Sequence, residues 1–137
     1  MSVVRAVAAI VAGYAVIVAL TTAGFNGWLK GANLYLGGPA MMLKGMLVAL
    51  IAGLVGGYIA ALIGGRRPIL HSALVLLPLS ADSFYVFFIF SRETPLWFEV
   101  LGSASLMAAT VVGGLVRNFQ RRTATLADVA IAPSSAP

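Results

Sequence analysis

Long runs of apolar residues, separated by short polar stretches, dominate this chain of 137 residues. Each run is close to the roughly 20 residues that an α-helix needs to cross the hydrocarbon core of a bilayer. The pattern therefore predicts an all-α integral membrane protein, built as an antiparallel up-down bundle of four transmembrane helices. The predicted helices cover residues 3–24, 41–65, 69–90 and 96–117.

Glycine, proline and charged residues mark the connections between the apolar runs. Residues 25–40 contain four glycines, one proline and the interfacial aromatic residues Trp28 and Tyr35, and we expect a loop at the membrane surface. Residues 65–68 and 91–95 are tight polar turns, so the helices that they join are expected to be antiparallel neighbours.

A single domain is expected over residues 1–123, followed by an irregular tail over residues 124–137. The tail is rich in alanine, serine and proline and shows no apolar periodicity. Within the third run, Pro78 has no N–H to offer the carbonyl of Leu74, and we expect a kink near that point.

The amino-acid composition also indicates that the chain is embedded in lipid rather than dissolved in water. Hydrophobic residues make up 61% of the chain and charged residues 9%, with a mean hydropathy of +1.00, whereas soluble domains carry about a quarter charged residues. The net charge of +5 does not indicate a nucleic-acid partner, because the basic residues sit at the ends of apolar runs. The absence of cysteine excludes disulfides and thiolate sites.

The distribution of lysine and arginine predicts the orientation, since positive residues are retained on the cytoplasmic side. The helix ends on the side of the two termini carry six lysine and arginine residues, and those on the opposite side carry three. We therefore expect both termini to be cytoplasmic. The six are Arg5, Arg66, Arg67, Arg117, Arg121 and Arg122, and the three are Lys30, Lys44 and Arg92.

Two short stretches, residues 56–58 (Gly-Gly-Tyr) and residues 65–68 (Gly-Arg-Arg-Pro), resemble those of small bacterial membrane proteins. The resemblance implies no activity. We expect the chain in the bacterial inner membrane.

Small residues recur every four positions in the second run and form two adjacent rows along the predicted helix. Close approach of backbones over small residues supplies much of the packing energy between helices in lipid. The second helix is therefore the expected centre of the bundle, and two alternatives stay open: both rows pack within the chain, or one faces a partner. The rows are Gly45, Ala49, Gly53, Gly57 and Ala61, and Ala52, Gly56, Ala60 and Gly64.

Asp82 is the ionisable residue that lies deepest in an apolar run. An ionised carboxylate inside hydrocarbon costs roughly 2.5 to 3.5 kcal/mol on insertion scales, so it needs a partner or a wet cavity. Lys44 and Glu99 enter the membrane from the same end, and we expect the three to form an intramembrane polar cluster. The cluster is either a proton or cation site or a polar clamp between helices.

Aromatic and basic residues form two candidate contact surfaces. Phe84, Phe87 and Phe88 are expected to contact lipid or another subunit, with a quinone or pigment contact as the alternative. The cluster Arg117, Arg121 and Arg122 is expected to bind anionic lipid headgroups, at about 1 kcal/mol per charge, or an acidic partner. The single histidine, His71, is expected to be a satisfied interfacial residue rather than a metal or pigment ligand.

No catalytic, cofactor or metal motif is recognisable, and an enzyme is not expected. The leading hypothesis is a non-catalytic accessory subunit that packs through its small-residue and aromatic faces against a larger membrane complex, respiratory or photosynthetic. A hetero-oligomer is favoured over a homo-oligomer, with bound lipid and no resident cofactor. The alternative is a small homo-oligomeric channel or transporter that uses Asp82.

Overall fold

The computed structural model describes residues 3–30, 37–65, 67–90 and 96–131, and all regular structure within these ranges is helical. The prediction of an all-helical chain with four apolar spans is confirmed for the described residues. The helices long and apolar enough to cross a membrane are Val3–Trp28, Gly38–Gly64, Pro68–Ile89 and Leu96–Leu126.

The first two spans extend into the predicted loop. Helix α1 (Val3–Ala23) continues into a π-helical turn, η1 (Gly24–Trp28), and α2 (Gly38–Gly64) begins three residues before the predicted start. Pro39 suits this early start because a proline in the first turn of a helix loses no hydrogen bond. Tyr35, expected at the membrane surface, lies outside the described residues.

The third span is interrupted at Val75, close to the predicted kink. Helix α3 (Pro68–Leu74) ends there, α4 (Leu76–Tyr85) follows, and a π-helical turn, η2 (Val86–Phe90), completes the span. Pro78 cannot donate a hydrogen bond to the carbonyl of Leu74, whereas Val75 N donates to His71 O at 3.3 Å and Leu79 N donates to Val75 O at 3.4 Å.

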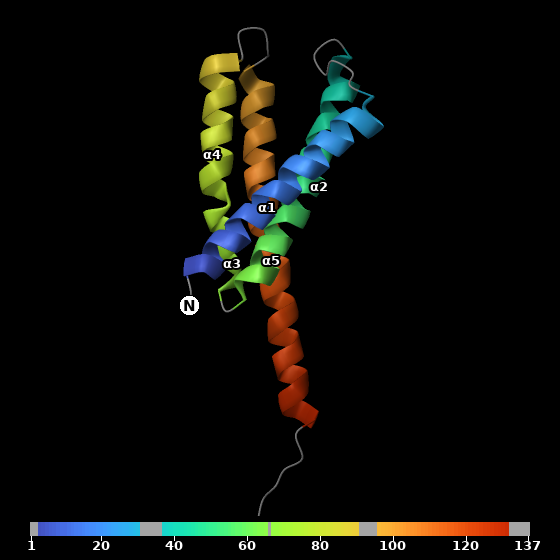
Figure 1. Ribbon diagram of the computed structural model, residues 1–137. Coiled ribbons are helices and arrows are strands. Elements are labelled where there is room, and N and C mark those ends of the chain that lie inside the picture. The colour runs from blue at the N-terminus through green and yellow to red at the C-terminus, as the bar shows by residue number, and fades with distance from the viewer. Residues whose placement is uncertain (1–2, 31–36, 66, 91–95, 132–137) are drawn as a thin grey trace, which may run out of the picture.

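Helix α5 (Leu96–Ile131) is longer than predicted. The irregular tail expected from residue 124 does not begin there, because residues 124–131 are helical; residues 132–137 lie outside the described part. Half of residues 124–131 are Ala124, Leu126, Ala127 and Ala130, which have high helix propensity, and this outweighs the lack of apolar periodicity. Figure 1 shows that the last turns of α5 project beyond the other helices.

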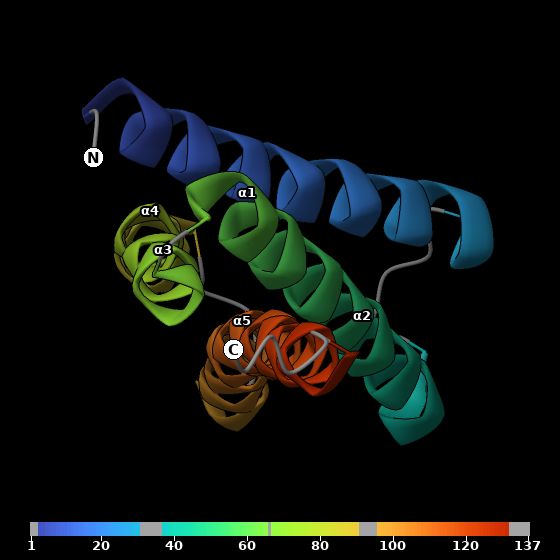
Figure 2. The ribbon, with the colours of Figure 1, turned by 90° about the horizontal axis from the view of Figure 1, so that it is seen from below.

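Helix α2 lies at the centre of the arrangement, as predicted. Its most extensive contacts are with α5 and α1, and Figure 2 shows α2 between these two helices. Helix α1 crosses α2 obliquely (Figure 1). Helices α1, α2 and α4, together with the junction between α3 and α4, share a small apolar core, which consists of Ile17, Ala52, Ala60, Val75 and Leu79.

The two small-residue rows of α2 contact different neighbours within the chain. The row that contains Gly53 faces α5, where a Cβ at Gly53 would lie 2.6 Å from the carbonyl oxygen of Leu106. The other row faces α1, where a Cβ at Gly56 would lie 2.8 Å from the carbonyl oxygen of Gly13. Such approaches are available only to residues without a Cβ, which explains why glycine lies at these crossings.

Candidate functional site: polar cavities at Asp82

Asp82 lies near the end of α4 and borders two cavities among the helices. Its side chain is exposed, because α4 makes only limited contact with the other helices and leaves space on both sides. The cavities have volumes of about 200 and 180 Å³. Residues of α5 complete both cavities, and Leu106 lines each of them.

The larger cavity lies between α2, α4 and α5 and contains a second carboxylate. Glu99, half-buried in the first turn of α5, lines it together with Asp82. The positive end of the α5 dipole stabilises a carboxylate at that position. Gly45 and Ala49 form part of the opposite wall, and their small side chains leave room for the cavity. Ser83 and Ser103 add hydroxyl groups to the lining.

The smaller cavity lies between α1, α4 and α5 and adds further hydroxyl groups. Tyr14, Thr21 and Thr22 line it with Asp82, and Tyr14 is close enough to Asp82 to interact electrostatically. The hydroxyl of Thr21 donates to the carbonyl of Ile17 at 2.7 Å, which leaves its oxygen lone pairs available as acceptors. Asp82 is therefore the residue common to both cavities that carries a formal charge.

The structure brings Asp82 and Glu99 to one cavity but does not bring Lys44 there. Lys44 is exposed on α2, is not among the described residues that line either cavity, and forms no ion pair with Asp82. Gly45, the next residue, faces the cavity, so Lys44 points away from it. The expected polar cluster of three therefore contains two carboxylates and several hydroxyls.

Carboxylate and hydroxyl oxygens are ligands for hard cations and carriers of protons. Among the described residues, no group of three or more His, Asp or Glu side chains is arranged to hold a metal ion. The arrangement suits reversible binding of a proton or a small hydrated cation better than a dedicated metal cage.

Tyr14, Thr21 and Thr22 are site residues that sequence reasoning missed. Their signal was present: Tyr14 and Thr21 are seven residues apart, so they share one face of a helix that is otherwise apolar. Hydroxyl groups on one face of a transmembrane helix indicate a polar neighbour or a cavity.

The aromatic surface lies on α4 and η2. Phe84 and Phe88 are 63% and 73% exposed, and their ring centroids are 4.3 Å apart. Phe87, expected on the same face, is half-buried. The exposed surface therefore consists of Phe84 and Phe88, with Tyr85 and Ile89 beside them.

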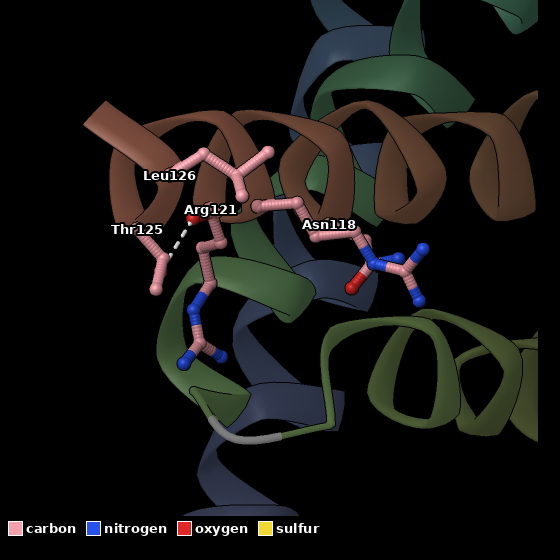
Figure 3. A pocket seen from close by; sticks show the side chains of 5 residues that line it. Asn118, Arg121, Thr125 and Leu126 are labelled. Atoms are coloured by element: carbon pink, nitrogen blue, oxygen red, sulfur yellow. Dashed lines mark hydrogen bonds between the residues drawn. The ribbon is translucent and has the colours of Figure 1, made fainter. Parts of the chain in front are cut away.

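Arginines from two helices bind the carbonyl groups at the C-terminal end of α2. Arg5 Nε donates to the carbonyl of Ile63 at 2.7 Å, and Arg121 donates to the carbonyl of Gly65. Figure 3 shows Arg121 extended from α5 toward the end of α2. Arg122 lines a hollow beside it, and Arg117 is half-buried, its Nε without a hydrogen-bond partner in the described part of the chain.

His71, expected to be a satisfied interfacial residue, is fully buried and packs against Gly64. Its Nδ1 lies 2.7 Å from the carbonyl oxygen of Arg67. A carbonyl only accepts, so Nδ1 carries the proton and donates it. The other ring nitrogen, Nε2, is buried without a partner among the described residues.

No protein-family model, curated protein or solved structure that was compared matches this chain. Its function therefore has to be inferred from the residues that line the cavities.

Proposed function

We propose that this chain is a small channel or transporter that takes up a proton or a small cation at Asp82. In this proposal the four apolar spans insert as an antiparallel up-down bundle, with both termini on the cytoplasmic side of a bacterial inner membrane. Four helices rarely enclose both a pathway and its walls, so the active form is a homo-oligomer.

The observation that supports the proposal is the position of Asp82 between two polar cavities. A carboxylate in an apolar span is costly unless water or a cation reaches it. Both cavities supply oxygen atoms, from Glu99 and Ser103 on one side and from Tyr14 and Thr21 on the other. If Asp82 served only as a polar clamp between helices, it would need one partner. It would not need two open cavities that meet at its side chain.

Flux through purified protein in liposomes tests the proposal. A pH-sensitive dye inside the vesicles reports proton movement, and ion-selective dyes report Na⁺ and K⁺. We expect Asp82→Asn to abolish the flux because the amide cannot take up a proton or hold a cation, and Asp82→Glu to retain part of it.

Ser80→Ala is the matched control, since Ser80 lies on the same helix but does not line either cavity among the described residues. It should leave the flux unchanged. A wild-type protein that moves none of the three ions, or an Asp82→Asn variant that is folded and as active as the wild type, contradicts the proposal.

A second candidate function is the accessory subunit, which the aromatic surface favours. Phe84 and Phe88 expose most of their rings on a helix with few neighbours, and aromatic side chains are enriched at protein interfaces. Native mass spectrometry of gently solubilised membranes distinguishes the two: a complex with other subunits supports this candidate, and copies of this chain alone support the channel or transporter.

A further inference from the structure

The C-terminal half of α5 carries an exposed apolar stripe. Phe119 and Leu126, two turns apart on one face of the helix, are 72% and 69% exposed. All members of this α5 stripe are exposed. They are Val112, Val116, Phe119, Thr123 and Leu126.

The spacing of the stripe is that of a coiled-coil seam. Its members follow one another at intervals of four, three, four and three residues, the alternation that brings two helices together along one seam. Thr123 fits the stripe because its hydroxyl donates to the carbonyl of Gln120 at 2.9 Å, which leaves its methyl group for packing.

Part of the stripe lies beyond the reach of lipid chains. Arg121 bonds to Gly65, one residue after α2 ends, so this level marks the end of the helical bundle. Arginines at such a position lie at the membrane surface. Leu126 is five residues further along α5, about 7 Å at the usual helical rise.

The last turns of α5 have no neighbour in the described part of the chain. Figure 1 shows α5 continuing alone beyond the other helices. A short isolated helix is marginal in water, and most helical stability in proteins comes from packing of an apolar face. The projecting helix therefore needs a partner that covers its stripe.

We propose that the α5 stripe pairs with the same stripe of a second copy of this chain, as a parallel two-helix seam around a two-fold axis along the membrane normal. The inference rests on the membrane insertion in the proposed function, because insertion gives every copy the same orientation. A parallel pair then places each stripe residue opposite its own equivalent.

The charges on α5 are compatible with this pairing. In the register set by the stripe, Arg117 and Arg121 lie on the outer side of the seam, and Arg121 is engaged with Gly65 of its own chain. Arg122 flanks the seam, where a parallel coiled coil places it near residue 127 of the other helix. Residue 127 is an alanine, so no like charges are brought opposite each other.

Disulfide formation in membranes tests the pairing, because the chain has no cysteine of its own. Leu126→Cys places a thiol in the seam, and Thr125→Cys, also exposed, places one on the side of the helix that faces away. After mild oxidation of the pelleted membranes, we expect a covalent dimer with Leu126→Cys and several-fold less with Thr125→Cys.

Native mass spectrometry of the wild type provides the second measurement. The expected species contains two chains of 14.2 kDa. Replacing Phe119 and Leu126 together by serine is expected to raise the dissociation constant of the dimer at least about tenfold.

Equal cross-linking at both positions overturns the pairing, as does a wild-type monomer, with or without bound lipid, or a complex with a different protein. In each of these cases the chain still pellets with membranes. The proposed function then stands or falls by the flux assay with the Asp82 variants. A chain that stays in the soluble fraction overturns the membrane insertion, and with it the proposed function.

Discussion

At the scale of single residues, the absence of a Cβ decides where the helices can cross. Gly57 on α2 lies directly against the backbone of Thr110 on α5, and Gly113 on α5 lies in the same way against Leu54 on α2. The two helices therefore interlock through backbone contacts. A methyl group at either glycine meets main-chain atoms, which cannot rotate away as a side chain can.

We expect Gly57→Ala to destabilise the protein by about 1 to 3 kcal/mol, the usual cost of overpacking. The matched control is Gly102→Ala on α5, where a Cβ would have no neighbour within 4 Å. Alanine has the higher helix propensity, so the control should be neutral or more stable by up to about 1 kcal/mol. Thermal unfolding in detergent measures both, and equal stability of the two variants would contradict the crossing.

At the scale of elements, the interruption of the third span shapes the candidate site. Helix α3 packs against α2 and α5, whereas α4 makes fewer contacts after the break at Val75. This departure of α4 from the other helices leaves room for the two cavities at Asp82. Pro78, one turn before Asp82, removes a helical hydrogen bond at this break.

Pro78→Ala is expected to join α3 and α4 into one continuous helix, because alanine can donate to the carbonyl of Leu74. Nitroxide labels on cysteines at the exposed positions 70 and 84 measure the change by pulsed electron resonance. The distance between the labels should increase in the variant. An unchanged distance would mean that packing, and not Pro78, causes the interruption.

At the scale of the whole molecule, charge and apolar length together predict how the chain lies in a membrane. The spans are apolar throughout their central parts, and the arginines of α1 and α5 meet at the end of α2. The positive-inside rule then predicts that this basic end lies on the cytoplasmic side.

The orientation can be measured with single cysteines. Thr94→Cys lies in the predicted outer turn and Ser134→Cys in the C-terminal tail. A membrane-impermeant maleimide added to intact cells should label position 94 at once and position 134 only after the membrane is made permeable. The reverse pattern would place both termini outside and would contradict the positive-inside assignment.

The sequence by itself determined the helices, because run length and hydropathy are local properties. The four apolar spans, the interruption near Pro78 and the central position of α2 were all predicted from such local patterns. The end of α5 was not predicted correctly. The helix propensity of its residues extends the helix beyond the last residue that follows the apolar periodicity.

Only the tertiary structure decided which side chains meet. Asp82 lines one cavity with Glu99 and the other with Tyr14, and Lys44 lines neither. By depth in the membrane alone, Lys44 and Glu99 were equally plausible neighbours of Asp82. The depth of a residue in the membrane follows from its position along the helix. The direction in which its side chain points depends on the rotation and tilt of that helix. The rotation and tilt of each helix are set by packing against its neighbours, here by the glycine crossings of α2. The sequence of a single segment does not contain that information.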